Sequence, residues 1–380
     1  MRLTEVNDIK GFFLLKDQWN KLLQKSNHTV FSTWEWVYLW WKHFGSNRRL
    51  IILLAEENKK LIGIAPLMYS VHSMFGLRQG KIEFIGTHPT TNAFVIEDEP
   101  TSGNDVVANY NDFIIEDGHE TCLPLFINHL QNLKIKWNIA DLTNIPENKI
   151  AISYISKVSN KIMPVHRCLH TPLPSSNETF HGSIKRKDRK EMRRYQRQIE
   201  KYGFKTELVD CSKKGLLKKA MIDLFSLNQK RWNTKGSPGA FTDMRRRNFY
   251  IDVANSFSQN GWLGLFCLKF SGKTVAVMYG FKYKGKYYAY KTGMDPEYSR
   301  FSVGNILFLK TMEKCIQEGL FEFDFMWGTD PYKRQFAPHE TSNYKAIIHR
   351  RRPFGTLKQS MYSEYWRQGE RLKYLQRKLL

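Results

Sequence analysis

The chain has 380 residues, of which 42% are hydrophobic and 14% aromatic, so we expect two domains with sizeable cores and exclude a disordered protein. The formal net charge of +23 at pH 7 favours a polyanionic partner, namely nucleic acid, an anionic membrane surface or a phosphorylated substrate. The sequence has no run of about 18 apolar residues, no secretory signal and only 5 widely spaced cysteines, so we expect a cytoplasmic protein, with the periphery of the inner membrane as the alternative location.

The first half predicts helices followed by strands. Residues 9–25 have the apolar spacing of an amphipathic helix, and a second helix follows, capped by Ser32 or Thr33 and ended by Gly45. The tryptophans of this second helix fit either a wide contact with a sheet or an aromatic ligand pocket. Strands are expected at 48–58 and 60–73, joined by a turn at Asn58-Lys59, then near 137–149 and 165–174.

The second half predicts a similar order. Helices are expected over 213–233 and over 241–261, the latter capped by Thr242 and ended by Gly261. A three-strand meander follows over 261–295, with turns at 271–272 and 284–285. A helix starts near Ser302 and is ended by Gly319, and strands follow at 321–327 and 344–351.

The two halves resemble each other in sequence. The strand pair "LIILLAEENKKLIGIAPLMY" aligns with "WLGLFCLKFSGKTVAVMYGF", and "WNIADLTNIPEN" aligns with "FEFDFMWGTDPY", so that Asp141 matches Asp324. This repeat predicts two copies of one mixed α/β module, residues 1–175 and 180–350, followed by a basic amphipathic tail at 351–380.

Three blocks carry a resemblance to a known family. "LNQKRWNTKGSPGAF", "GMDPEYSRFSVGNILF" and "FDFMWGTDPYKRQFAP" resemble the C-terminal domain of CelD-like acyltransferases of the GNAT superfamily, which are linked to cellulose or other exopolysaccharide synthesis. That family is similar in turn to FemAB-type transferases with tandem GNAT domains. The resemblance implies tandem GNAT-like domains, each with a mixed, largely antiparallel sheet flanked by helices.

The resemblance also implies an enzyme. A GNAT-type N- or O-acyltransferase would move an acyl group from a thioester, usually acyl-CoA, to an amine or hydroxyl on a small molecule or glycan precursor. An aminoacyl-tRNA-dependent FemAB-like aminoacyltransferase is the first alternative, and the high positive charge favours it. A non-catalytic nucleic-acid-binding protein is the second, although no helix-turn-helix, zinc finger or RNA-binding signature is present.

Donor phosphates are expected at the helix that begins near residue 302. Helix N-termini bind anions through free N–H groups and the helix dipole. The segment "RFSVGN" places Arg300, Ser302, Gly304 and Asn305 there, with one glycine fewer than the usual GNAT phosphate loop. The acceptor is expected near Arg231, Trp232 and Asp295, which lie in the resembling blocks.

The last block is expected to carry the chemistry. In residues 321–327 apolar side chains stand at 321, 323, 325 and 327, so Asp324 should face the opposite side of a buried strand, in line with Glu322. Asp324 is the candidate general base, or else a structural partner of Lys333. Tyr332 is the candidate proton donor to the leaving thiolate, and Lys333 is the candidate anion-binding residue.

Residues 185–201 predict a docked helix with a basic outer face. This stretch has nine basic and three acidic residues, and Arg189, Arg193 and Arg197 are the candidate contacts to a polyanion such as tRNA or an anionic membrane. Separately, His166, Cys168 and His170 share one face of a strand, but no fourth zinc ligand is evident, so we expect no metal.

Overall fold

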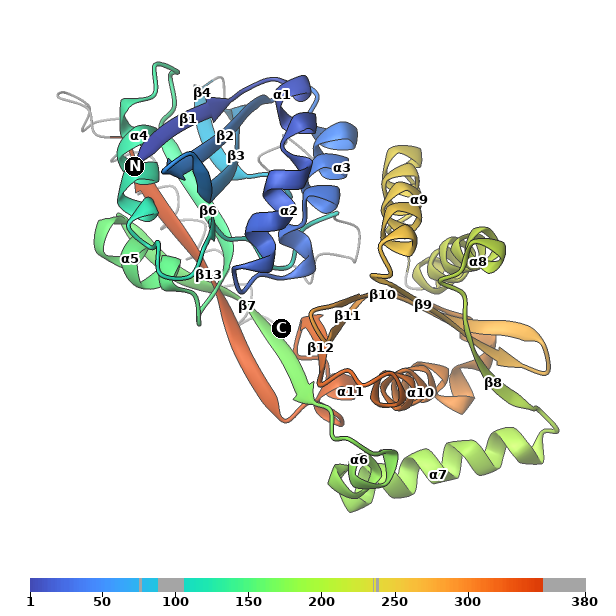
Figure 1. Cartoon of the computed structure of the whole chain (residues 1–380). Helices are drawn as coiled ribbons and strands as arrows, with labels where there is room; N and C mark the ends of the chain where they lie inside the picture. The colour runs from blue at the N-terminus through green and yellow to red at the C-terminus, as the bar shows by residue number, and fades with distance from the viewer. Residues whose placement is uncertain (75–76, 88–105, 235, 237–238, 351–380) are drawn as a thin grey trace, which may run out of the picture.

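The computed structural model describes residues 1–74, 77–87, 106–234, 236 and 239–350. Within these residues one 13-stranded sheet runs through the whole molecule, and helices cover both of its faces (Figure 1). The elements of the first half are β1 (Arg2–Val6), α1 (Ile9–Leu14), α2 (Lys16–Gln24), η1 (Val30–Ser32), α3 (Trp34–Phe44), β2 (Arg49–Glu57), β3 (Lys60–Met74), β4 (Leu77–Phe84), β5 (Ile114–Ile115), α4 (Cys122–Asn132), β6 (Ile139–Pro146), α5 (Ile150–Val158) and β7 (Lys161–Pro172).

The second half repeats this order after two additional helices. Its elements are α6 (Asn177–Ser183), α7 (Arg186–Lys201), β8 (Thr206–Asp210), α8 (Lys214–Asn233), α9 (Met244–Gln259), β9 (Leu263–Phe270), β10 (Lys273–Tyr283), β11 (Lys286–Met294), η2 (Pro296–Phe301), α10 (Val303–Gln317), β12 (Glu322–Trp327), α11 (Pro331–Arg334) and β13 (His339–His349).

The strand order of the second half mirrors that of the first, except that the last strand of each half lies in the sheet of the other. Twelve strands follow the order β1-β2-β3-β4-β6-β13-β7-β12-β11-β10-β9-β8, and the thirteenth, β5, pairs with β3 beside this path, so β1 to β4 and β6 correspond to β8 to β11 and β12. The last strand of each half crosses to the other half, because β13 pairs with β6 and β7 pairs with β12. The division at residues 175–180 therefore stays a prediction, since each half completes its sheet with a strand of the other.

Local sequence signals account for most of the element ends. The turns at 58–59, 271–272 and 284–285 all have positive φ at both central residues, which confirms the predicted tight hairpins. Thr33 caps α3 by accepting a hydrogen bond from the Trp36 amide, as predicted. Two predictions were wrong in detail. Helix 9–25 is divided at Leu15 into α1 and α2, and Asp243, not Thr242, caps α9, because its carboxylate accepts from the Arg245 amide.

One aromatic core joins the two halves. Helices α1, α2 and α3 of the first half and α8 and α9 of the second pack on the same core. Trp36 of α3 is fully buried, and its ring lies 5.2 Å from that of Phe249 in α9 and 5.5 Å from that of Tyr290 in β11. Trp34 and Trp40 are buried as well, so these tryptophans are core residues, and Trp36 makes the predicted helix–sheet contact through Phe281 and Tyr290.

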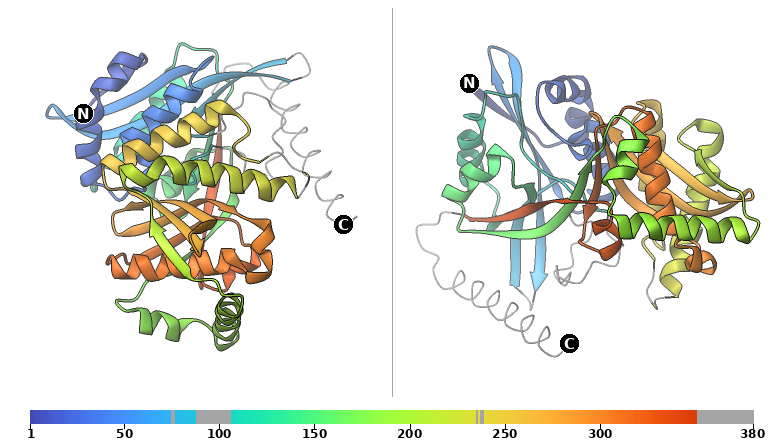
Figure 2. Two further views of the ribbon diagram at one scale, coloured as in Figure 1. Left: turned by 90° about the vertical axis from the view of Figure 1, so that its right-hand side faces the viewer. Right: turned by 90° about the horizontal axis from the view of Figure 1, so that it is seen from below.

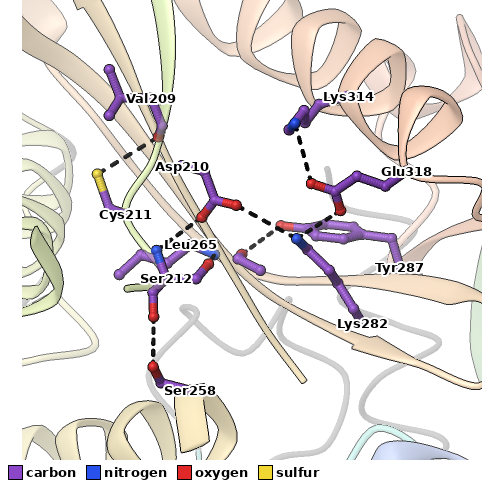
Figure 3. Close-up of polar contacts among 11 residues, drawn as sticks. Val209, Asp210, Cys211, Ser212, Ser258, Leu265, Lys282, Tyr287, Lys314 and Glu318 are labelled. Carbon is purple, nitrogen blue, oxygen red and sulfur yellow. Dashed lines mark hydrogen bonds and ion pairs between the residues drawn. The ribbon is translucent and has the colours of Figure 1, made fainter. Parts of the chain in front are cut away.

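A polar network fastens the outer strand β8 (Figure 3). Lys282 of β10 lies 2.7 Å from a carboxylate oxygen of Glu318, just after α10, and 3.7 Å from a carboxylate oxygen of Asp210 at the end of β8. The hydroxyl of Ser212 accepts a hydrogen bond from the Leu265 amide at 2.9 Å. This network lies at the C-terminal end of α10, opposite the end that faces the candidate site.

Candidate functional site

The parallel strands β11 and β12 separate toward their C-terminal ends. They pair only from Lys286 with Glu322 to Tyr288 with Asp324, although β11 continues to Met294 and β12 to Trp327. β4 and β6 separate in the same way after Glu83 and Asp141. Each half therefore has an opening between parallel strands, and the residues around the second opening include most of the predicted site.

Helix α10 begins directly beyond the second opening. Ser302 has a left-handed φ of 50° and its side chain makes no capping hydrogen bond, while the first intrahelical amide to bond is that of Ile306, to the Ser302 carbonyl. The preceding amides are those that a helix start leaves for a ligand. Arg300 is exposed beside this start, where its guanidinium lies over the Tyr202 ring at 4.5 Å.

Residues from the predicted acceptor, donor and catalytic sets lie around Met294. A guanidinium nitrogen of Arg231 lies 3.8 Å from the Met294 sulfur. A Cβ added at Gly304 would lie 2.9 Å from the same sulfur, so glycine lets the start of α10 approach β11. Burial raises the pKa of the Tyr332 hydroxyl, and the nearby charge of Arg231 acts against this rise. We name Arg231, Met294, Gly304 and Tyr332 the Met294 cluster.

The other cofactor and acceptor candidates lie around this cluster. Asn305 donates from its side-chain amide to the Gln335 side chain at 3.1 Å, which ties α10 to the segment after α11. Trp232 is half-buried at the end of α8. Asp295 is buried and already engaged, because its carboxylate lies 2.7 Å from the Lys230 ammonium and accepts from the Glu297 amide.

Asp324 is buried on the other face of the sheet, where it contacts Tyr110 of the first half. One carboxylate oxygen accepts from the Tyr110 hydroxyl at 2.7 Å and the other accepts from the Met326 amide at 2.7 Å. Only 6% of Asp324 is exposed. Burial raises its pKa from 3.8 to about 6, although both hydrogen bonds act against that rise.

A bulge in β12 changes the predicted alternation of side chains. Met326 has a φ of 62°, and the register with β7 shifts between Asp324 and Trp327. Phe323 and Phe325 share one face of the strand as predicted and pack with α10, but Trp327 packs on the opposite core, so its predicted side was wrong. The extra residue of the bulge reverses the side on which every later residue of the strand lies.

Lys333 is buried beneath this bulge. Its ammonium donates to the Trp327 carbonyl and lies 3.8 Å from a carboxylate oxygen of Asp330. Burial lowers the pKa of Lys333, and the charges of Asp330 and Asp324 act against this. Cys168 of β7 lies opposite Trp327 in register, and burial raises the pKa of its thiol. We name Tyr110, Cys168, Asp324 and Lys333 the Asp324 cluster.

The segment 106–113, which the sequence analysis did not single out, reaches both openings. At the first opening the Ala108 amide donates to the Gly86 carbonyl at 2.7 Å, and the Asn111 amide donates to the Asn144 carbonyl at 2.9 Å. At the second opening Tyr290 donates to the Val107 carbonyl and Trp327 donates to the Asn109 carbonyl. The one sequence signal is the buried, asparagine-rich run "VVANYNDF" without strand or helix periodicity.

The equivalent position in the first half has different chemistry. Asp141, which matches Asp324, is ion-paired with Lys81 at 2.6 Å and with Lys345 at 3.1 Å. Burial alone would raise its pKa, but these lysines outweigh burial and the pKa is lowered. Helix α4 corresponds to α10, and acidic residues at 116, 117 and 120 precede its start. Anionic phosphates are disfavoured beside these carboxylates.

Helix α7 lies at the edge of the second half, on the side away from the first half (Figures 1 and 2). Met192 and Ile199 are buried, and the outward stripe consists of Arg186, Lys190, Arg193, Arg197 and Lys201. Arg189 differs from the other two predicted contacts, because it is half-buried and its guanidinium donates to the His181 carbonyl at 3.2 Å. The predicted tail at 351–380 lies outside the described residues.

Two further expectations concern metal and membrane. Among the residues that the structure describes, no group of three or more His, Cys, Asp or Glu side chains is placed to hold a metal ion. His166 instead stacks on Trp327, with ring centres 3.8 Å apart. In the described part of the chain no helix combines the length and apolar character needed to cross a membrane.

The repeated strand order, the openings between parallel strands and the helix that begins beyond each one define a tandem GNAT-like fold. The predicted mixed α/β fold is thereby confirmed. Residues 186–334 match the family model for an acetyltransferase (GNAT) domain, so the second half carries a GNAT-type domain. No curated protein is significantly similar in sequence to this chain.

Solved structures agree with this fold over nearly the whole chain. The structure is similar to FemX, with 11% identity, a TM-score of 0.57 and coverage of 92% of this chain and 98% of FemX. It is also similar to the C-terminal domain of a putative lysylphosphatidylglycerol synthetase from Agrobacterium fabrum, with 10% identity, a TM-score of 0.53 and coverage of 88% and 92%. A third similar structure is L-PGS from Bacillus licheniformis, with 10% identity, a TM-score of 0.52 and coverage of 89% and 93%. At such low identities the structural similarity shows the fold alone, and the activity has to be argued from the site.

Proposed function

We propose that this protein is an acyltransferase with one donor site, located in the second half. The observation that carries the proposal is the second opening, where the start of α10, Arg300 and the Met294 cluster lie together. The acyl group would come from a thioester such as acyl-CoA and go to an amine or hydroxyl acceptor. Its place in polysaccharide or envelope synthesis, and the CelD-like assignment, stay predictions.

The difference between the halves supports a single donor site. The first opening is occupied by the chain itself, because segment 106–113 is bound there through its backbone to Gly86 and Asn144. The acidic residues before α4 further disfavour phosphates. At the second opening the same segment covers only the face with the Asp324 cluster, and the Met294 cluster lies on the face toward α10.

For acyl transfer the protein has mainly to position the acceptor against the thioester and to supply groups that accept and donate protons. The acceptor nitrogen or oxygen attacks the thioester carbonyl, a C–N or C–O bond forms, the C–S bond breaks and the thiolate takes a proton. In our proposal the acceptor reaches Asp324 through the opening between β11 and β12, whose pairing ends at Asp324; Asp324 accepts its proton, and Tyr332 on the face toward α10 donates one to the thiolate. Arg300, Ser302, Gly304 and Asn305 bind donor phosphates, Lys333 holds α11 beneath the bulge, and Arg231 and Trp232 border the acceptor. Asp295 orders η2 through its ion pair.

Donor binding can be tested by placing two side chains of the same shape and different charge at the start of α10. Gly304→Asp adds a carboxylate beside the first amides of α10 and should reduce the rise in melting temperature caused by acyl-CoA. Gly304→Asn makes the same steric contact with Met294 and has no charge, so it is the matched control, and its affinity should exceed that of Gly304→Asp roughly tenfold or more. Equal losses in both variants would indicate a steric effect, and equal retention would place the phosphates elsewhere.

A second candidate donor is aminoacyl-tRNA, and the basic stripe of α7 favours it. The stripe from Arg186 to Lys201 is about 22 Å long at 1.5 Å per residue and ends beside Tyr202, on which Arg300 stacks. A polyanion lying along α7 would therefore reach the start of α10. FemX-like structure is compatible with either donor, so the melting temperature should be measured with acyl-CoA and with charged tRNA in parallel.

The role of α7 can be tested by charge reversal. Arg193→Glu with Arg197→Glu should weaken tRNA binding roughly tenfold or more and flatten its dependence on salt, because phosphate contacts release counterions. Lys218→Glu with Lys219→Glu changes the net charge equally on an exposed part of α8 and should have a smaller effect. If both pairs act equally, binding depends on net charge and not on α7. If neither acts, the stripe is only a solvated surface.

A further inference from the structure

Tyr110 of the first half contacts the candidate base of the second. The two residues are 214 positions apart in the chain, yet the Tyr110 hydroxyl donates to Asp324 at 2.7 Å. Both side chains are buried, with 7% of Tyr110 and 6% of Asp324 exposed. Water therefore supplies little of the solvation of this carboxylate, and Tyr110 is one of its two hydrogen-bond donors.

The other hydrogen-bond donor to Asp324 is the Met326 amide, which lies in the bulge of β12. The Met326 amide donates to Asp324 while Met326 holds a left-handed φ of 62°, a conformation that is uncommon for a residue with a side chain. The bulge in turn presents the Trp327 carbonyl to the Lys333 ammonium. Lys333 belongs to α11, which also carries Tyr332 of the Met294 cluster.

Segment 106–113 holds the same bulge at a second point. The Asn109 carbonyl accepts from the Trp327 indole at 3.0 Å and from the Asn343 side chain at 2.7 Å. Tyr110 and Asn109 are adjacent, so one piece of the first half fixes both Asp324 and Trp327. The contacts form a continuous path from Tyr110 through Asp324 and the bulge to α11.

We propose that Tyr110 is a positioning residue for the second half: it holds the Asp324 carboxylate and, through the bulge at Met326, the helix that carries Tyr332 and Lys333. The positioning of Asp324 and α11 is argued from the hydrogen bonds, and its effect on catalysis rests on the proposed acyl transfer. Residues 180–350 alone lack this donor, so the inference predicts that the site of the second half requires the first half.

The hydroxyl can be removed without changing the ring. In Tyr110→Phe the Asp324 carboxylate loses a donor that favours its ionised form, so its pKa should rise by about one unit. If ionised Asp324 is the base, the acidic limb of the pH–rate profile should move upward by the same amount. An Asp324→Asn background lacks this limb, and there Tyr110→Phe should cause little additional loss of rate, because residues acting through one another are not additive.

Tyr290→Phe is the matched control. The Tyr290 hydroxyl donates to the Val107 carbonyl at 2.9 Å, so this change also removes a buried hydrogen bond to segment 106–113, but without a bond to Asp324. Its acidic limb should stay at the wild-type pH. An equal movement of the limb in both variants, or none in Tyr110→Phe, would overturn the inference.

A measurement without substrate separates this inference from the proposed function. Every group whose pKa changes on folding contributes to the pH dependence of urea unfolding, so the curve is compared with that of Asp324→Asn, and the difference reports the pKa of Asp324 in the folded state. Tyr110→Phe should move the corresponding part of that curve to higher pH, and Tyr290→Phe should not. If the curve moves and no donor supports transfer, the acyltransferase proposal fails while the coupling holds. If transfer is found and the curve does not move, the coupling is wrong.

Discussion

Asp324→Asn is expected to lower turnover by roughly a hundredfold or more while the protein stays folded and still binds its donor. The size of the effect is that of losing a general base. The carboxylate has the properties for this role, because burial raises its pKa to about 6, toward the range useful for a general base at neutral pH. The measurements are kcat, the melting temperature and the donor affinity of the same variant.

Glu322→Gln is the control for this experiment. Glu322 is in the same strand and lies 2.9 Å from the Lys286 ammonium, so the change also converts a carboxylate to an amide in β12. It should leave turnover nearly unchanged. A normal turnover with a lowered melting temperature in Asp324→Asn would mean that Asp324 is structural, with its hydrogen bonds to Tyr110 and Met326 as its whole role.

The difference in stability between Asp324→Asn and the wild type should also depend on pH in a defined direction. The folded-state pKa of about 6 exceeds the ordinary value of 3.8, so Asp324 contributes stability that is fully present below about pH 4 and is lost as pH rises through 6. The difference corresponds to on the order of 3 kcal/mol. Asparagine does not titrate, so between pH 4 and pH 7 the variant should gain stability relative to the wild type.

Trp36→Ala should lower the free energy of unfolding by about 3–5 kcal/mol, which is typical for removing a large aromatic side chain from a core. Trp36 is fully buried, and its ring packs against Phe31 of the first half and Phe249, Phe281 and Tyr290 of the second. Because the cavity would open between the halves, urea unfolding should remain one transition with a lower midpoint.

Phe13→Ala provides the comparison. Phe13 is also aromatic and in the first half, but it is 56% exposed, so its loss should change the free energy of unfolding by less than about 1 kcal/mol. If Trp36→Ala instead produces two transitions and only one of them moves, residues 1–175 and 180–350 unfold independently. The exchanged strands β7 and β13 argue for the single transition.

Local pattern in the sequence predicted the elements well. The hairpins at 58–59, 271–272 and 284–285, helix α8 and the helix after Ser302 all depend on residues close together in the chain. The repeat that matched Asp141 with Asp324 also predicted the corresponding strands β6 and β12. Turn residues, caps and apolar spacing act over a few positions, so a single sequence contains the information needed to identify them.

The surroundings of Asp324 were decided by tertiary structure. The bulge at Met326, which moved Trp327 to the other face, depends on a hydrogen bond and on pairing with β7. The inward turn of Arg189 depends on the His181 carbonyl of the preceding helix, and helical spacing alone did not distinguish it from Arg193.

The sequence by itself determined a basic protein with a repeated mixed α/β module and a candidate phosphate-binding helix start. Only the tertiary structure decided that β7 and β13 exchange between the halves and that segment 106–113 fills one opening and reaches the other. It also decided that Tyr110 would hold Asp324 across 214 positions of chain. Contacts between such distant residues leave no periodicity in the sequence, because they form only when packing brings the segments together.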